Sequence, residues 1–206
     1  HRETSYPIGT TATGGPIRNE SSGLHQNWIS ALLPDLDCQV VADHVDFSRS
    51  VYDAENERVR IMRLPMVQCP SASNLLRNTS AYAGIHHSVE APIDTTNDGV
   101  FILNRPIGSN EITDGLSYTL LLGEKISNPT DDLGWMSGTR STLRNTGSGI
   151  SKTNPDPTVV FDASKIAPGV PGALAVGSLS SHHPGGVHLL TAAGEISFRN
   201  SSTDHQ

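Results

Sequence analysis

Histidine is the residue type in this chain with the strongest metal-binding chemistry, and the nine histidines include two tight clusters. His182, His183 and His188 fall within seven residues, and His86 and His87 are adjacent. A zinc site needs three or four ligands that converge at about 2 Å on rigid elements. Adjacent histidines on a Pro-Gly loop do not converge by themselves. We therefore expect no metal site, and we expect His183 to hydrogen-bond backbone across a turn.

Two groups of acidic and amide side chains carry the oxygen ligands that calcium prefers. Asp94, Asn97 and Asp98 form one group, and Asp131 and Asp132 form the other. Neither group has the fixed spacing of an EF-hand loop. We interpret both as solvated loop carboxylates and expect no cofactor, with calcium as the one alternative left open.

Motifs for nucleophilic catalysis and for phosphate binding are absent from the sequence. Gly147-Ser148-Gly149 lacks the G-x-S-x-G spacing, and no glycine-rich phosphate loop is present. Glu124 ends an apolar segment, where a carboxylate is more often bonded to backbone donors or a histidine than catalytic. We predict that the chain is not an enzyme. A hydrolase would need a nucleophile within hydrogen-bond reach of His183 or His188.

The two cysteines, Cys38 and Cys69, leave two interpretations open. In an exported protein they could form a disulfide, worth about 3–4 kcal/mol in the chain-entropy model. Otherwise they are two small, buried, unpaired side chains, one in each of two elements. Two cysteines define no spacing pattern that decides between these alternatives.

Charge argues against a nucleic-acid partner, and hydropathy indicates no membrane-spanning segment within these residues. The 14 Lys and Arg do not cluster and stand against 21 Asp and Glu, so nucleic-acid binding through phosphates is not expected. No apolar run approaches the roughly 20 residues that span a bilayer. At 206 residues, the chain is predicted to form a single globular domain over residues 1–206.

The segment 180–200 has the clearest local pattern in the chain. The apolar run Val187–Ala192 and the alternating run Glu195–Arg199 flank Ala193-Gly194, where glycine allows the positive φ of a tight turn. This pattern predicts a two-stranded hairpin. Alternation places Ile196 and Phe198 on one face of the second strand, which we expect to pack while the other face is solvated.

Other segments predict short helices followed by strands. Apolar residues at helical spacing predict a helix from Trp28 that ends near Pro34, and a second helix is expected from about Ser48 to Met62. Loops are expected at 139–157 and 168–177. Strands are expected at 66–69, 80–85, 99–103, 118–123, 135–136 and 158–161, with 118–123 central in the sheet. Strands clustered after helices indicate an α+β fold with a largely antiparallel sheet and long loops.

Several blocks of this sequence occur in an order typical of one family. They are Tyr6–Gly9, Trp28–Pro34, Val67–Ser71, Ser80–Gly84, Ile112–Glu124, and His183 followed by nine residues and Ala193-Gly194. Together they resemble the bacterial pilin-like exported proteins known as domain of unknown function 1559. In that family the last block ends in Asp-Gly, so the histidine and glycine match here and the aspartate does not.

The resemblance implies a structural role for the residues that carry these blocks. They are Cys69, Pro70, Asp114, Gly115, Gly123, Glu124, His183, Gly185, Gly186 and Gly194. It also implies a pilin-like head domain whose N-terminal anchor helix is missing from this sequence. The expected role is non-enzymatic assembly, with other pilin-like subunits or type II secretion machinery as partners. The expected location is the cell envelope or the exterior, with membrane contact only through the missing helix.

The alternative role is a secreted carbohydrate- or protein-binding module on the same scaffold. Trp28, Trp135, Tyr52 and Tyr82 could supply a stacking platform for a sugar. Exposed aromatic side chains that line one groove would favour this alternative, and buried ones would favour the structural role.

Overall fold

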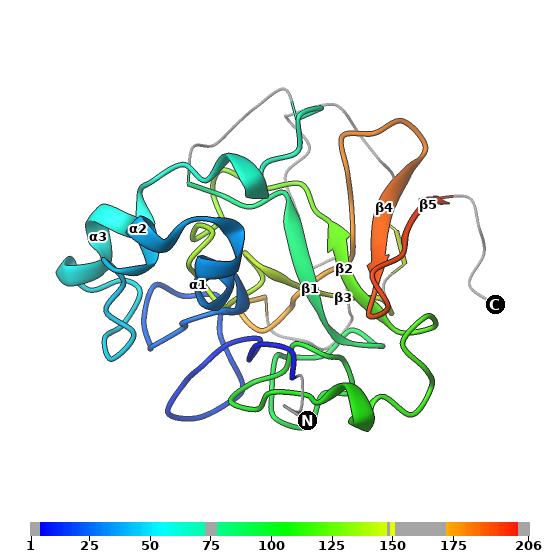
Figure 1. Ribbon diagram of the computed structural model, residues 1–206, viewed down its shortest axis with the longest axis horizontal. Helices are drawn as coiled ribbons and strands as arrows, with labels where there is room; N and C mark the ends of the chain where they lie inside the picture. The colour runs from blue at the N-terminus through cyan, green and yellow to red at the C-terminus, as the bar shows by residue number, and fades with distance from the viewer. Residues whose placement is uncertain (1–4, 73–77, 148, 151–171, 202–206) are drawn as a thin grey trace.

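Short α-helices precede a β-sheet in the computed structural model, which describes residues 5–72, 78–147, 149–150 and 172–201. The α-helices gather on one side of the sheet, and the C-terminal strands form its opposite edge (Figure 1). The α-helices are α1 (Trp28–Leu32), α2 (Gln39–Ala42) and α3 (Ala54–Arg60), and the 3-10 helices are η1 (Pro34–Leu36), η2 (Pro65–Val67) and η3 (Ser109–Glu111). The strands are β1 (Tyr82–His87), β2 (Leu120–Glu124), β3 (Leu143–Asn145), β4 (Gly186–Thr191) and β5 (Ile196–Asn200).

The five strands form one sheet in the order β3-β1-β2-β4-β5. Three of the neighbouring pairs are antiparallel, and only β1 and β3 run parallel. The predicted α+β class with a largely antiparallel sheet is therefore confirmed. Strand β2, from the most apolar predicted strand, lies at the centre because its side chains can be covered on both sides.

The C-terminal hairpin forms as predicted, with Gly194 in the turn at φ +87°. The expected packing of β5 is wrong, because Ile196 is 74% and Phe198 is 47% exposed. The register explains this: Ile196 pairs with Leu190 and Phe198 with His188, so they share the face opposite to the buried core residues of β4. At the edge of the sheet, that face reaches the surface.

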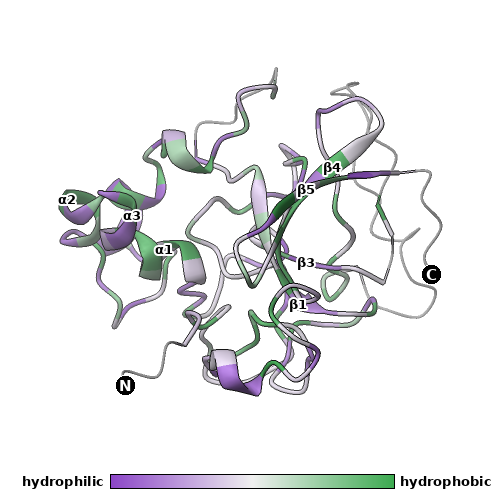
Figure 2. Cartoon of the chain, turned by 45° about the vertical axis from the view of Figure 1, so that its right-hand side comes forward, coloured by the Kyte–Doolittle hydropathy of each residue, from purple (hydrophilic) through white to green (hydrophobic). Residues whose placement is uncertain are grey.

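Helix α1 forms because a cap and an apolar stripe both start there. The Asn27 side chain accepts a hydrogen bond from the Ser30 amide at 3.1 Å and also anchors the helix to residue 135 of the core. Trp28, Ile29 and Leu33 are buried, and the helix ends near Pro34 as predicted, with Pro34 beginning η1. Figure 2 shows α1 as mostly hydrophobic, whereas α3 is largely hydrophilic.

The second helix is shorter than predicted, since α3 spans only Ala54–Arg60. Before it, the Asp46 carboxylate accepts from the amide and the hydroxyl of Ser48, at 2.9 and 2.6 Å. Such local side-chain bonds stabilise a turn at the expense of helix. Helix α2 was not predicted.

Three predicted strands are wrong, although all of their apolar residues except Met66 are buried. Segment 66–69 begins inside η2, 135–136 lies in a turn, and 99–103 runs beside β1 without joining a ladder. Phe101 donates its amide to the Ile85 carbonyl at 3.1 Å, which accounts for that placement. A short buried apolar run does not by itself distinguish a strand from an irregular segment. The predicted strand 158–161 lies outside the described residues.

The predicted loop 139–157 contains a strand instead of only loop, because β3 is buried. Its polar neighbours bond to one another: the Thr139 hydroxyl contacts those of Ser137 and Ser141 at 3.0 and 3.2 Å. Polar composition therefore misled the prediction, since these groups are satisfied internally rather than by water. Residues 151–157, and 168–171 of the other predicted loop, lie outside the described residues.

The largest hydrophobic core lies between the helices and the sheet. Its buried members are Ile17, Trp28, Ile29, Leu33, Val51, Val59, Leu64, Val67, Ile93, Phe101, Leu103, Trp135, Met136, Leu143 and Val176. In a smaller cluster, Val187 and Leu189 of β4 pack with Ile85 and Leu179. Within the described part of the chain, no helix has the length and apolar character required to traverse a bilayer.

Candidate functional site

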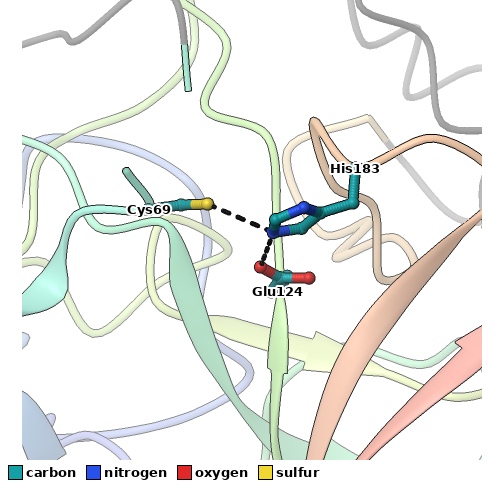
Figure 3. Close-up of side chains that lie close together, drawn as sticks. All are labelled: Cys69, Glu124 and His183. Atoms are coloured by element: carbon teal, nitrogen blue, oxygen red, sulfur yellow. Dashed lines mark hydrogen bonds and ion pairs between the residues drawn. The ribbon is translucent and has the colours of Figure 1, made fainter. Parts of the chain in front are cut away.

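Three side chains from separate parts of the chain point toward one another at the C-terminal end of β2. Figure 3 shows Cys69, Glu124 and His183, with the imidazole of His183 contacting the other two. His183 Nε2 lies 3.1 Å from Glu124 Oε1 and 3.5 Å from Cys69 Sγ. The Sγ, Nε2 and carboxylate oxygen all lie within 4.8 Å of one another.

Cys69 is positioned by the segment that joins η2 to β1. The Ala81 amide donates to the Val67 carbonyl at 2.8 Å, and the Gln68 side chain donates to the Thr79 carbonyl. These bonds hold the backbone just before Cys69, and Cys69 itself is only 4% exposed. The thiols of Cys69 and Cys38 are both free. The sequence left a disulfide and two unpaired cysteines as alternatives, and the structure agrees with the unpaired alternative.

Glu124 is the last residue of β2 and is nearly shielded from solvent, at 3% exposure. One carboxylate oxygen, Oε2, accepts from the His188 amide at 2.7 Å and contacts His188 Nδ1 at 3.1 Å. The other oxygen, Oε1, faces His183. The expectation that this carboxylate is bonded to a backbone donor and to histidine is confirmed.

His183 lies in the loop before β4. Ser181 holds this loop, because its hydroxyl accepts from the His183 amide at 3.0 Å and donates to the Gly186 carbonyl at 2.6 Å. The expected backbone contact of the His183 ring is wrong: the ring contacts the Glu124 carboxylate and the Cys69 thiol instead. The Ser180 amide of this loop donates to the Glu124 carbonyl at the end of β2, which brings the His183 ring close to those groups.

A pocket of about 450 Å³ opens beside the three side chains. Besides Cys69, Glu124, His183 and His188, its walls are mostly apolar, formed by Pro70, Tyr82, Leu122, Gly123, Leu189, Leu190 and Ile196. Burial raises the pKa of the Tyr82 hydroxyl, and the neighbouring Cys69 and Glu124 raise it further. The site is thus a small polar cluster in a low-dielectric surrounding, where charge interactions are strong.

The geometry at His183 differs from that of a nucleophilic triad. In a triad, the base contacts the nucleophile with one ring nitrogen and the orienting carboxylate with the other. Here the Cys69 thiol and the Glu124 carboxylate both contact Nε2. The carboxylate therefore competes with the thiol for this nitrogen. Sulfur, imidazole nitrogen and carboxylate oxygen are, however, all ligands used by zinc.

The residues singled out from the sequence separate into two sets. Cys69, Pro70, Gly123, Glu124 and His183 line the pocket, and Gly185 and Gly186 join its loop to β4. Asp114, Gly115 and Gly194 do not line it; Gly115 and Gly194 occupy turns with φ of +90° and +87°.

The other histidine cluster and the acidic groups are used elsewhere. His86 and His87 contact Asn97 and Asp98, at 3.0 and 2.5 Å, so the adjacent histidines meet the first of the two acidic groups. Asp131 pairs with Arg140, and Asp132 pairs with Lys125 at 2.5 Å. The interpretation of Asp131 and Asp132 as solvated carboxylates is wrong.

Sequence reasoning did not bring Cys69, Glu124 and His183 together. Cys69 and His183 are 114 positions apart, and no local pattern joins residues at such a distance. The one available signal was that each residue belongs to a different block of the family resemblance. His188, which the sequence groups with His183, also lies in the site, as does Tyr82, which the sequence suggested only as a stacking residue.

The fold and site define an α+β protein with a Cys-Glu-His cluster, buried at the cysteine and the glutamate, on the end of a largely antiparallel sheet. A family model described as "Protein of unknown function (DUF1559)" matches residues 1–206, and the chain belongs to this family. No curated protein and no solved structure was found to match the chain.

Proposed function

We propose that this chain is the head of an exported, pilin-like protein with a non-enzymatic, structural role in assembly. The observation that carries the proposal is that Glu124 and His183 contact each other and hold two parts of the sheet together. They lie in two blocks of the family resemblance and join the end of β2 to the loop and first strand of the C-terminal hairpin. The family membership and the α+β sheet support the same scaffold role.

The geometry at His183 supports the non-enzymatic part of the proposal. A thiol nucleophile needs a base whose proton affinity is raised by a carboxylate on the opposite ring nitrogen. Because Glu124 and Cys69 share Nε2, that arrangement is not present among these three residues.

The positions of the tryptophans favour assembly over the sugar-binding alternative. Trp28 and Trp135 are 4% and 0% exposed, and their indole N–H groups donate to the carbonyls of Thr142 and Met62, both at 3.0 Å. Indoles held in the core cannot stack on a sugar ring. Glycan-array binding by the chain would nevertheless support the alternative, and it would count against a purely structural role.

Partners of this head would be other pilin-like subunits or secretion machinery, and its location the cell envelope or the exterior. The test is to express the complete gene product in its native cells, fractionate them and apply a short amine cross-linker. We expect envelope localisation and cross-linked multimers. The 206-residue chain alone serves as the control and should sediment as a monomer at micromolar concentration.

Two outcomes would overturn this proposal. One is recovery of the complete protein as an uncross-linked monomer in the cytosolic fraction. The other is a tight oligomer of the 206-residue chain, because assembly would then not depend on an anchor helix.

A further inference from the structure

We infer that Cys69, Glu124 and His183 form a binding site for a divalent transition metal, with zinc as the ion that fits best. The ligand atoms would be the Cys69 thiolate, His183 Nε2 and Glu124 Oε1. This inference goes beyond the assembly role and does not depend on it.

The two separations at His183 Nε2 match those of a tetrahedral zinc centre, and all three ligand atoms lie within 4.8 Å of one another. Ordinary zinc–ligand lengths place a thiolate sulfur about 3.5 Å and a carboxylate oxygen about 3.3 Å from the imidazole nitrogen. In this protein the corresponding separations at His183 Nε2 are 3.5 Å to Cys69 Sγ and 3.1 Å to Glu124 Oε1. The side chains therefore need little rearrangement to accept an ion.

The hydrogen-bonding capacity of His183 also points to an ion. A ring nitrogen has either one N–H or one lone pair in the ring plane, so it makes one good hydrogen bond. Yet a thiol and a carboxylate both approach Nε2. A proton on this atom can serve only one of them well, whereas a metal ion bound at their common focus would bond all three.

A second layer of contacts holds Glu124 in a suitable position. Its Oε2 is occupied by the amide and the Nδ1 of His188, which leaves Oε1 to face His183. Carboxylate ligands of metals are commonly fixed by such outer hydrogen bonds. The His183 backbone is itself held by the hydroxyl of Ser181.

Burial and ligand type favour zinc over calcium or magnesium. Cys69 and Glu124 are 4% and 3% exposed, so two potential negative charges lie close together where water screens them poorly. A divalent cation would neutralise them. Calcium and magnesium prefer sets made only of oxygen ligands, while a sulfur, nitrogen and oxygen set suits zinc.

Three protein ligands leave one tetrahedral position for a further ligand. All three line the apolar pocket of about 450 Å³, so a molecule in that pocket can reach an ion held by them. The site thus has the form of an open metal centre, whose fourth ligand is water or the polar group of a small apolar molecule.

The test uses the untagged 206-residue chain, treated with a chelator and then titrated with Co²⁺, a spectroscopic substitute for zinc. We expect one Co²⁺ per chain, with a thiolate-to-cobalt charge-transfer band and tetrahedral d–d bands. Added Zn²⁺ should displace the cobalt and raise the melting temperature, because it binds the folded state.

The variants separate this site from other thiols and histidines. Cys69→Ser should abolish the charge-transfer band, whereas Cys38→Ser, which changes the second free thiol, should leave it unchanged. His183→Gln should prevent binding, and His182→Gln should not. His188→Ala should weaken binding by about 10–100-fold, because it removes an outer contact of Glu124. Circular dichroism of each variant checks that the fold is kept.

Three results would overturn the inference: wild-type protein with no charge-transfer band, a band that survives Cys69→Ser, or a band lost in Cys38→Ser. If Cys69→Ser fails to fold, alkylation of the wild-type thiols answers the same question. Bound Zn²⁺ should then protect Cys69, but not Cys38, from the reagent, and equal labelling of both thiols with and without Zn²⁺ would contradict the site.

Discussion

The ammonium group of Lys125 lies 2.5 Å from Oδ2 of Asp132, and these side chains are 0% and 3% exposed. The same ammonium donates to the Ser127 hydroxyl at 2.8 Å. Burial lowers the pKa of Lys125, and the negative charge of Asp132 opposes that effect. Because Lys125 directly follows Glu124 in the chain, this buried pair fixes the end of β2 and hence the floor of the candidate site.

Removing the acidic partner of this pair should be strongly destabilising. In Asp132→Asn, the Lys125 charge stays buried without its counter-ion, and we expect a loss of about 3–5 kcal/mol in the free energy of unfolding. Urea denaturation measures it. The exposed Arg18–Glu20 pair supplies the control, since Glu20→Gln should cost less than about 1 kcal/mol. Equal effects of the two substitutions would contradict this account of Lys125.

Stability should fall as the pH is lowered from about 6.5 to 4, in part because of His86. This residue is 0% exposed, and burial lowers its pKa from 6.5 to about 4. Between those values the unfolded chain binds a proton that the folded chain does not. The contribution is fully present above pH 6.5 and is lost as the pH falls toward 4; in total it is on the order of 3 kcal/mol.

The variant His86→Gln tests this contribution, because glutamine keeps a side-chain donor for Asn97 without titrating. Its unfolding free energy should vary less steeply with pH, by up to about 1.4 kcal/mol per pH unit. Burial likewise lowers the pKa of His25 to about 4, so some pH dependence will remain. An unchanged slope between pH 4 and 6.5 would refute the assignment to His86.

Two glycines of the C-terminal hairpin should respond differently to alanine. A side chain at Gly186 would collide with the Arg199 carbonyl of β5, and backbone cannot move aside without opening the ladder. At Gly194 the surrounding space is open, and only φ of +87° opposes a side chain. We expect Gly194→Ala to cost about 1 kcal/mol and Gly186→Ala clearly more, about 2–3 kcal/mol. Thermal unfolding of the two variants would show whether this order holds.

Two phenylalanines give a matched test of where the core lies. Phe101 is 2% exposed, and its ring centroid lies 5.2 Å from that of Trp28; Phe198, on the edge strand, is 47% exposed. Phe101→Ala should cost about 3–5 kcal/mol through lost burial and a cavity. For Phe198→Ala we expect less than about half of that loss. Similar losses in denaturant titrations would mean that the outer face of β5 is covered in solution.

Local patterns in the sequence were sufficient for elements that depend on neighbouring residues. The hairpin at 187–199 needs only two β-permissive runs and a glycine turn, and it is found in the structure. The first helix likewise follows from an apolar stripe and Pro34. In contrast, 99–103 is apolar but joins no ladder, and the polar segment around 143–145 contains a buried strand.

The composition and order of residues alone determined the α+β class, the central position of β2 and the family resemblance, because these depend on short-range periodicity and on the order of blocks. The tertiary structure alone decided that the Cys69 thiol and the Glu124 carboxylate both contact His183 Nε2. Those residues come from three distant segments, and only the pairing of β2 with β1 and β4 brings the segments together. A site that forms through long-range strand pairing leaves no local pattern in the sequence. The neighbours of each of the three residues in the chain do not specify what lies across the sheet.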